Sequence, residues 1–314
     1  MVKFTPAPLA APLPDDALLA EIEAVALELA RLAGVEITAT LTREITVQYK
    51  REPRGTAAPT DPVSEVDHAI ERLLRERLGQ RFPAHGIVGE EVPDHPSPDH
   101  EFVWAVDPVD GTTNFVNGFP LFACSIGVLH RGRPVVAAVW CSASHELRPG
   151  VYHARRGGGL HFEQHPVVPG GRPRTGVTRR LAAAPGGSPR RTARWDHRVT
   201  GSAAIESAFV AAGIFSCAIF WSPGLWDVAA GATLLLESGH EVWTRGPGRA
   251  GWVPFERFEA PTTVRERRAP SLRDWRRPLI VGERDAVETL RRTARGPSLW
   301  RRARFRLRRL LTRR

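Results

Sequence analysis

Cysteine and methionine are scarce in this chain of 314 residues, which contains three cysteines and one methionine. Cys124, Cys141 and Cys217 form no C-x-x-C pair, and no histidine stands at a zinc-like spacing from a Cys or Glu. These features argue against a zinc site and a disulfide framework. Because the cysteine count is odd and no signal-peptide pattern opens the sequence, we expect free thiols in a cytoplasmic protein.

Long apolar runs and lysine are also scarce. No run of about eighteen apolar residues is present, so we expect no membrane-spanning helix. Lys3 and Lys50 are the two lysines, and arginine supplies the other positive charges. The formal net charge is +10, but residues 300–314 hold eight arginines and no acid, so residues 1–299 carry only +2. A body with so little net charge does not predict a specific nucleic-acid partner.

Both ends differ from the body in composition. Residues 1–14 are rich in Ala and Pro and predict a flexible arm. Residues 291–314 form a basic tail, in which leucines recur at helical spacing among arginines. As an amphipathic helix, residues 298–314 could bind an anionic membrane surface or a partner. A solvated, frayed terminus is the alternative.

The segment around Asp107 carries the densest chemistry in the chain. Residues 102–106 predict a buried strand, which places Asp107 at the edge where open α/β folds build ligand sites. Pro108 has no N–H and is expected to end the strand ladder. Asp107 and Asp110 supply oxygen ligands suited to Mg²⁺, and the N–H groups after Gly111 suit a phosphate. Alone, such a pattern is more often a polar turn with one capping and one salt-bridged carboxylate.

Three other acidic segments count against that simpler interpretation. Residues 86–91 predict a short strand that ends in two acids, the first of which is Glu90. A helix with apolar residues at helical spacing is predicted to begin near Asp67. Asp227 opens a second helical segment, where a lone carboxylate would usually only complement the helix dipole. Four acidic clusters together are better explained by a shared site.

Together the four clusters resemble the inositol monophosphatase family, within the superfamily of Mg²⁺-dependent, lithium-sensitive phosphatases that includes fructose-1,6-bisphosphatases. The long central segment is highly specific, and the order and spacing match over most of residues 16–290. The matching segments are residues 61–67, 89–91, 107–115, 201–204 and 226–231.

The resemblance implies roles for individual residues and a cofactor of two or three Mg²⁺ ions per site. The implied metal ligands are Glu90, Asp107, the carbonyl of Val109, Asp110 and Asp227. The implied catalytic residues are Glu90, Thr112 and Asp67, with Thr112 and Glu90 orienting the attacking water. The implied phosphate-binding N–H groups belong to Gly111 and Thr112. The implied substrate-binding positions are Gly201, Ser202, Ala203 and Phe220.

These residue types suit phosphoryl transfer, which needs positioning and charge neutralisation more than covalent catalysis. Several carboxylates must converge because clustered metal ions otherwise repel one another. A hydroxyl and a carboxylate beside the attacking water can orient it and accept its proton. No Cys or His nucleophile is required.

The resemblance also implies the fold, a layered αβαβα arrangement with two sub-domains and the site between them. We expect an α+β metal-binding unit over residues 15–145 and a smaller α/β unit over residues 146–290. Enzymes of this family are usually oligomeric, so a homodimer is expected.

The sequence departs from the family in the segment that contacts the substrate. Inositol phosphatases carry a Glu upstream of the Trp-Asp pair, where this chain has Phe220, and residues 219–225 contain no acid. We therefore do not expect myo-inositol 1-phosphate to be the preferred substrate. Phe220 and Trp221 could stack a flat ligand or belong to the core. Lys50 is a candidate for the metal-linked lysine of the family's mobile loop.

Three functional hypotheses follow. The first is a Mg²⁺-dependent phosphomonoesterase that hydrolyses a small polyol or sugar phosphate by attack of an activated water. The second is a phosphatase for a nucleotide of the 3'-phosphoadenosine phosphate type or for histidinol phosphate. The third, of another class, is an inactive homologue that binds a membrane or partner through its arginine-rich tail. The presence of every implied metal ligand favours the first two.

Overall fold

The computed structural model describes residues 12–51, 60–97, 100–169, 179–183, 194–246, 250–264 and 268–294. The predicted membrane-binding tail lies outside these residues, as does most of the predicted N-terminal arm. Within them, no helix is both long and apolar enough to cross a membrane. All three cysteines are buried as free thiols, as expected.

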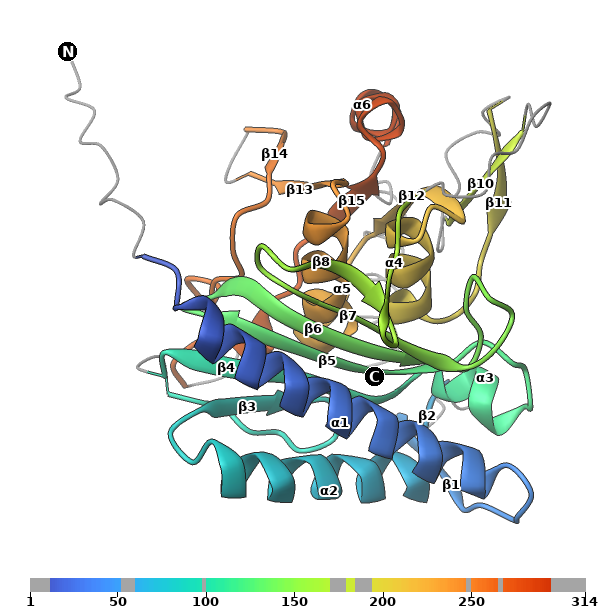
Figure 1. Cartoon of the computed structure of the whole chain (residues 1–314), viewed down its shortest axis with the longest axis vertical. Coiled ribbons are helices and arrows are strands. Elements are labelled where there is room, and N and C mark those ends of the chain that lie inside the picture. The colour runs from blue at the N-terminus through green and yellow to red at the C-terminus, as the bar shows by residue number, and fades with distance from the viewer. Residues whose placement is uncertain are drawn as a thin grey trace, which may run out of the picture.

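Two antiparallel helices form the outer layer on one side of the molecule (Figure 1). Helix α1 (Asp16–Thr40) begins after Asp15, whose carboxylate accepts a hydrogen bond from the Ala17 N–H. Helix α2 (Glu65–Arg81) begins with a capping box between Ser64 and Asp67. The apolar sides of both helices cover one face of the larger sheet. A short hairpin, β1 (Val47–Arg51) and β2 (Thr60–Ser64), connects them.

The larger sheet has seven strands in the order β3-β4-β5-β6-β7-β8-β9. Only β3 and β4 pair in parallel, and the other neighbours are antiparallel. The strands are β3 (Gly86–Gly89), β4 (Phe102–Asp110), β5 (Ala123–His130), β6 (Arg133–Cys141), β7 (Gly150–Arg155), β8 (Gly159–Phe162) and β9 (His165–Pro166). The sheet therefore extends beyond residue 145, the expected end of the first unit, because β7 to β9 continue one ladder with β6.

A second sheet lies on the far side of two buried helices, α4 (Ala203–Ala211) and α5 (Leu225–Glu237) (Figure 1). Its strand order is β11-β10-β12-β15-β13-β14. The strands are β10 (Arg180–Ala183), β11 (Trp195–Arg198), β12 (Phe215–Phe220), β13 (Glu241–Arg245), β14 (Trp252–Pro254) and β15 (Leu279–Gly282). Helix α6 (Arg284–Thr293) covers its outer face. The layers are thus helix, sheet, helix, sheet, helix, which confirms the predicted architecture.

Close packing between α5 and the larger sheet fixes the position of Asp227. Gly127 of β5 allows this approach, because a Cβ atom there would lie 2.5 Å from the Ala230 nitrogen. Ser125 of the same strand donates a hydrogen bond of 3.3 Å to the Trp226 carbonyl. Since Ser125 pairs with Asp107 in the ladder, these contacts bring the start of α5 beside β4.

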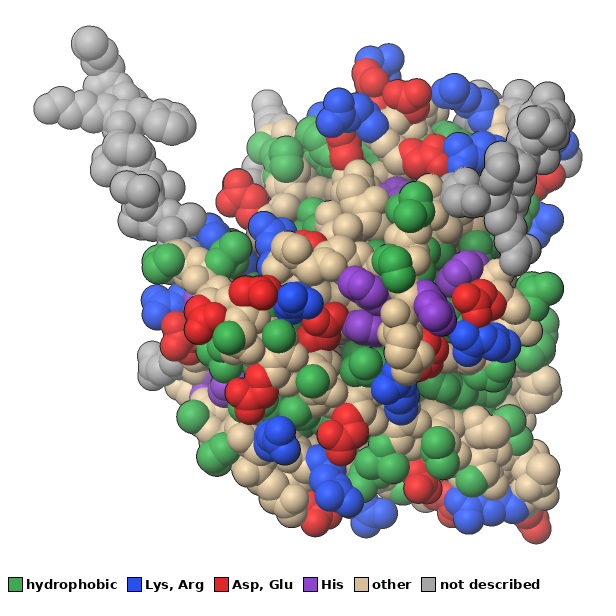
Figure 2. All heavy atoms as spheres, viewed as in Figure 1, with side chains coloured by type: hydrophobic (Ala, Val, Ile, Leu, Met, Phe, Trp, Pro, Cys, Tyr) green, Lys and Arg blue, Asp and Glu red, His purple; other side chains and the backbone are tan. Residues whose placement is uncertain are grey.

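Surface charge is mixed on the face shown in Figure 2, where described acidic and basic side chains are interspersed. This distribution agrees with the small net charge of residues 1–299.

Candidate active site

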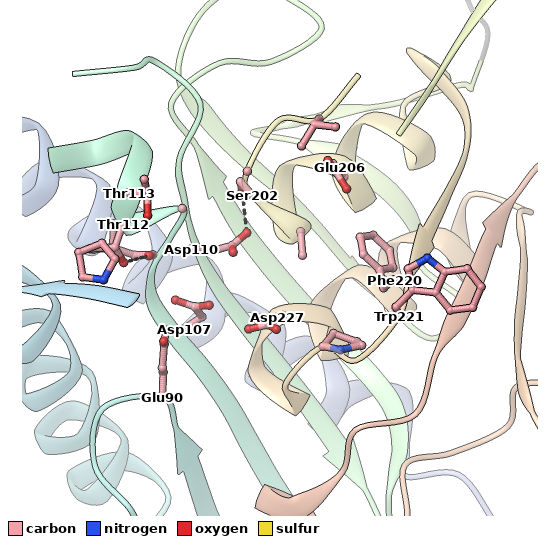
Figure 3. A pocket seen from close by; sticks show the side chains of 17 residues that line it. Glu90, Asp107, Asp110, Thr112, Thr113, Ser202, Glu206, Phe220, Trp221 and Asp227 are labelled. Carbon is pink, nitrogen blue, oxygen red and sulfur yellow. Dashed lines mark hydrogen bonds between the residues drawn. The ribbon is translucent and has the colours of Figure 1, made fainter. Parts of the chain in front are cut away.

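A cavity of about 420 Å³ opens where the end of β4 meets the starts of α4 and α5 (Figure 3). It lies between the larger sheet and the second unit, as predicted. The predicted site residues that line it are Glu90, Asp107, Val109, Asp110, Gly111, Thr112, Gly201, Ser202, Ala203, Phe220 and Asp227. Asp67 does not line the cavity and lies fully buried behind Thr112.

A β-bulge explains how two aspartates three residues apart serve the same cavity. In a regular strand they would point to opposite faces. Here Asp107 pairs with Ser125 and Asp110 with Ala123, so β4 contains one residue more than β5 over this stretch. Pro108 therefore does not end the strand as we expected; it lies in the bulge, and β4 continues to Asp110. A proline is tolerated there because the ladder is already interrupted.

Asp110 and Asp227 are each anchored through one carboxylate oxygen. Oδ2 of Asp110 accepts hydrogen bonds of 2.6 Å from the Ser202 hydroxyl and from the Ala204 N–H. Oδ2 of Asp227 accepts one of 2.6 Å from the Gly224 N–H at the start of α5. Asp107 differs, because its buried Oδ1 has no hydrogen-bond partner. Burial without a partner is costly for a polar atom, which suggests that Asp107 is built to bind something else.

Burial and mutual repulsion raise the pKa values of these three carboxyl groups. Burial is the largest cause for each, and the charges of Glu90, Asp110 and Asp227 further raise the pKa of Asp107 well above its usual value. The pKa of Asp227 is raised to about 8. That of Asp110 rises only to about 6, because the bonds from Ser202 and Ala204 favour its charged form. An all-oxygen cluster in which negative charge is this unfavourable fits a divalent cation, which would relieve the repulsion.

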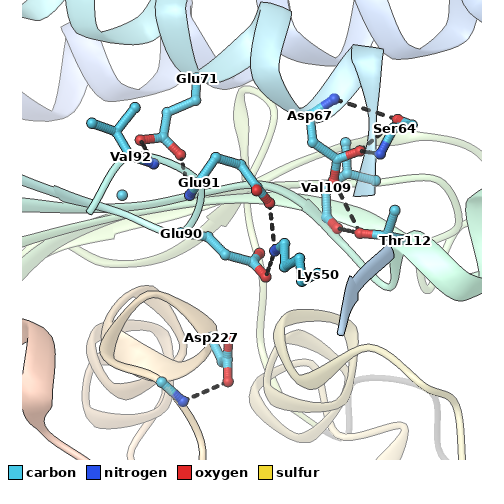
Figure 4. Close-up of polar contacts among 12 residues, drawn as sticks. Lys50, Ser64, Asp67, Glu71, Glu90, Glu91, Val92, Val109, Thr112 and Asp227 are labelled. Atoms are coloured by element: carbon cyan, nitrogen blue, oxygen red, sulfur yellow. Dashed lines mark hydrogen bonds and ion pairs between the residues drawn. The ribbon is translucent and has the colours of Figure 1, made fainter. Parts of the chain in front are cut away.

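Glu90 is paired with Lys50 in this arrangement (Figure 4). The Lys50 ammonium donates hydrogen bonds of 2.6 Å to Glu90 and 2.7 Å to Glu91. No three His, Cys, Asp or Glu side chains of the described ranges surround one point closely enough to hold an ion. The ammonium neutralises part of the charge of Glu90, a carboxylate that also lies close enough to Asp107 to raise the pKa of that group.

The loop that carries Glu90 is held from both sides. Glu71 of α2, which is fully buried, accepts hydrogen bonds from the Glu91 and Val92 N–H groups at 2.6 and 3.1 Å. Arg273, in the 3₁₀ turn η1 (Leu272–Asp274), donates to the carbonyls of Gly89, Glu90 and Val92. The same guanidinium lies over the Trp226 ring, 5.0 Å from its centroid. These contacts fix the backbone around Glu90.

Thr112 connects the cavity to the buried Asp67. Its hydroxyl lies 3.0 Å from Oδ1 of Asp67 and 2.9 Å from the Val109 carbonyl oxygen, and it can donate its one proton to either (Figure 4). Oδ2 of Asp67 is occupied by the Ser64 N–H and hydroxyl. Burial raises the pKa of Asp67, although its bonds with Ser64 and Thr112 oppose that effect. The Thr112 hydroxyl and the Asp67 carboxylate thus form a hydrogen-bonded pair at the edge of the cavity.

Gly111 and Gly201 bring two distant segments into contact. Both have positive φ angles, +92° and +80°, which disfavour other residues. Asn114 of α3 (Thr112–Val116) donates hydrogen bonds to the carbonyls of Leu121 and Thr200 at 2.6 and 2.7 Å, and so fixes the approach to α4. The first backbone bonds within α3 are donated by Asn114 and Phe115 to the Gly111 carbonyl. The N–H groups before them therefore have no partner within the helix.

Phe220 belongs both to the core and to the cavity wall. Its side chain is buried in the main apolar cluster, yet it lines the cavity together with Trp221. The structure confirms the core interpretation for Phe220, and stacking on a flat ligand stays a prediction.

Sequence reasoning missed three residues around the cavity, namely Glu206, Glu71 and Arg273. Glu206 lines the cavity from α4, four residues after Ser202. That helical spacing could have indicated it. Glu71 and Arg273 reach the Glu90 loop from distant parts of the chain, so no local pattern marks them.

Comparison with known proteins agrees with this geometry. Residues 18–269 match the model of the inositol monophosphatase family. The inositol-1-monophosphatase of Rhizobium meliloti (strain 1021) is 36% identical over 201 residues, which cover 58% of this chain and 71% of that protein.

Two solved structures share the fold. The extragenic suppressor protein suhB from Bartonella henselae has a TM-score of 0.65 at 23% identity, covering 87% of this chain and 98% of that one. An IMPase/NADP phosphatase complexed with Mg²⁺ and phosphate has a TM-score of 0.65 at 20% identity, covering 89% and 97%. The chain therefore belongs to the inositol monophosphatase family and is a phosphoric monoester hydrolase.

Proposed function

We propose that the chain is a Mg²⁺-dependent phosphomonoesterase that hydrolyses a small polyol or sugar phosphate. The observation that carries this proposal is the buried cluster of Asp107, Asp110 and Asp227, in which Oδ1 of Asp107 lacks a partner. The family is known for Mg²⁺ dependence, and a structural neighbour was solved with Mg²⁺ and phosphate. The relatives named inositol-1-monophosphatase favour neither a nucleotide nor histidinol phosphate as the substrate.

We assign the metal ligands to Glu90, Asp107, the Val109 carbonyl, Asp110 and Asp227. Bound Mg²⁺ would neutralise phosphate charge and make an attacking water more acidic. Lys50 bonds one oxygen of Glu90, Oε1, which leaves the other oxygen of that carboxylate for a metal ion. The anchors on Asp110 and Asp227 keep one oxygen of each directed to the cavity, so these ligands are positioned before the substrate binds.

The remaining residues bind the phosphate and handle the proton. The N–H groups of Gly111 and Thr112 would hold phosphate oxygens at the start of α3. With its own proton donated to Oδ1 of Asp67, the Thr112 hydroxyl presents lone pairs that can accept a hydrogen bond from the attacking water. Glu90 orients the same water. The water oxygen bonds to phosphorus and the ester P–O bond breaks; the water gives up one proton and the departing alkoxide takes up one, so the products are inorganic phosphate and the alcohol.

Phosphate release from a panel of monoesters, with millimolar Mg²⁺ or with EDTA, tests this function. We expect release only with Mg²⁺, and we expect Asp110→Asn to lower kcat/KM by roughly 100-fold or more, since even partners outside the ligand shell cost 10–100-fold. Asp285→Asn, an exposed acid in the first turn of α6, is the matched control. Absence of release from every substrate at millimolar Mg²⁺ would contradict the proposal.

We further propose a homodimer in the cytoplasm. Light scattering after size-exclusion chromatography measures the mass directly, and a particle of one chain's mass, 34.6 kDa, would contradict the dimer.

A further inference from the structure

Glu206 is a buried acid at the end of the cavity away from Glu90 (Figure 3). It is only 2% exposed, which is rare for a carboxylate without a cationic partner. Its bonds come from Thr200. The Thr200 N–H donates to Oε1 at 3.1 Å, and the Thr200 hydroxyl lies 3.0 Å from Oε1 and 3.1 Å from the Ser202 carbonyl oxygen, so it can donate its one proton to either. In the part of the chain that the structure describes, no group hydrogen-bonds the other oxygen, Oε2. One oxygen is thus fixed, and the other is available at the cavity wall.

The position of Glu206 follows from the helix that carries it. Ser202 and the Ala204 N–H, at the start of α4, hold Asp110. Glu206 lies one turn further along α4, on the same side as Ser202. It is therefore next to the carboxylate cluster but outside it. The same cavity extends from Asp110 and Thr112 to this end, so it has room for the alcohol part of a monoester whose phosphate lies at the aspartates.

The other groups at this end are mostly apolar. Phe220, Trp221 and Pro223 line the wall, and Ser202 is already engaged with Asp110 and the Ile205 N–H. Such a wall suits the C–H surface of a short carbon chain or ring. Glu206 is the polar group positioned to contact a hydroxyl there, and the segment 219–225 contributes no acid of its own.

We propose that Glu206, held by Thr200, forms a hydroxyl-binding subsite for the alcohol that carries the phosphate. The enzyme would then select monoesters whose alcohol has a second hydroxyl group, such as a polyol or sugar. This inference rests on the proposed function, because it takes the phosphate to lie at the aspartate end. The acid that contacts the substrate then comes from α4. The segment between β12 and α5, residues 219–225, contains no acid that could do so.

Two monoesters that differ only in hydroxyl groups test the subsite. Glycerol 2-phosphate and isopropyl phosphate share a secondary carbon at the ester oxygen, but only the first has further hydroxyls. We expect the wild type to have the higher kcat/KM for glycerol 2-phosphate. Glu206→Gln should lower the ratio of the kcat/KM for glycerol 2-phosphate to that for isopropyl phosphate by roughly 10-fold, because a charge-assisted hydrogen bond becomes a neutral one. The glutamine can still accept the bonds from Thr200, so folding should be preserved.

Controls separate a subsite from a structural role. Glu237→Gln is the control, because Glu237, like Glu206, is a helix residue that accepts backbone N–H donation through one oxygen, here from Gly157 and Gly159, but it lies outside the cavity lining. It should leave the preference unchanged. Glu206→Asp keeps the negative charge on a side chain that is one methylene shorter. It should lower the ratio of the two kcat/KM values less than Glu206→Gln does. Equal losses on both substrates, or an unchanged ratio in Glu206→Gln, would overturn the proposal.

A binding measurement distinguishes failure of this inference from failure of the proposed function. The rise in Tm caused by each monoester in the presence of Mg²⁺ reports binding whether or not hydrolysis follows. A larger rise with glycerol 2-phosphate that Glu206→Gln removes would support the subsite even without phosphate release. Release of phosphate with no difference between the two esters, in either measurement, would leave the function intact and reject the subsite.

Discussion

Single residues determine which carboxylate oxygens remain available in the cavity. Asp110 and Asp227 each have one oxygen bonded to a helix start, whereas one oxygen of Asp107 has no partner. The sequence indicated these acids but not how each oxygen is used. Asp227 was expected to be either a helix-capping acid or a ligand. The structure shows that its carboxylate accepts the capping bond through Oδ2 alone, which leaves Oδ1 for a second role.

The Thr112 hydroxyl provides a residue-scale prediction. Thr112→Val removes the group that bonds Asp67 while keeping a similar shape, so we expect kcat to fall by roughly 10²-fold or more, the usual contribution of a positioned proton acceptor. Thr112→Ser keeps the hydroxyl and should restore most of the activity. Steady-state kinetics at saturating Mg²⁺ measures both. If the valine and serine variants had the same kcat, the hydroxyl would have no part in catalysis.

At the scale of elements, local sequence signals predicted where helices and strands occur better than they predicted which strands pair with one another. The strand that leads to Asp107 is present as predicted, and the predicted helix near Asp67 begins at Glu65. The bulge at Pro108 was not predicted, because a strand that continues past a proline depends on pairing with β5. The placement of β7 to β9 also depends on pairing between distant segments, which local periodicity does not encode.

Arg273 supports an element-scale prediction. Its guanidinium bonds three carbonyls of the Glu90 loop, so Arg273→Ala should loosen that loop and raise the Mg²⁺ concentration needed for half-maximal activity by roughly 10–100-fold. Arg273→Lys should recover little, because an ammonium lacks the planar fork that reaches several acceptors.

The neighbouring Arg277 is the matched control for Arg273. Arg277 donates to the Arg245 carbonyl in the second sheet, so Arg277→Ala should leave the Mg²⁺ requirement unchanged. Initial rates measured over a range of Mg²⁺ concentrations give the concentration for half-maximal activity of each variant. An unchanged requirement in Arg273→Ala would show that the other contacts of the loop, among them those of Glu71, fix it without Arg273.

At the scale of the whole molecule, the site exists because two units meet. The larger sheet supplies Asp107 and Asp110, and the second unit supplies Asp227 and Glu206. The resemblance to a known family allowed us to predict the layered fold and a site between the two units. It did not indicate Glu206, because that acid is effective only through its placement beside Thr200 and the cavity.

Joining the units concentrates negative charge, and this predicts how Mg²⁺ affects stability. The folded-state pKa values of Asp107, Asp110 and Asp227 are raised, to about 6 for Asp110 and about 8 for Asp227. In the unfolded chain an Asp titrates near ~3.9. Between these values the folded state binds more protons, so the metal-free protein loses stability as pH rises from about 4 toward 8.

Mg²⁺ should relieve this repulsion, and its effect on Tm should therefore be larger near pH 8 than near pH 6, the values where Asp227 and Asp110 titrate. Thermal unfolding with Mg²⁺ and with EDTA at both pH values measures the difference. Glu206, whose pKa is raised to about 7 by burial and by the charge of Asp110, titrates in the same range and adds to this effect. Asp227→Asn removes one titrating group and should shrink the pH effect. Equal stabilisation by Mg²⁺ at both pH values would mean that the carboxylates are already charged and tolerated in the metal-free protein, and that the cluster is not held together by the cation.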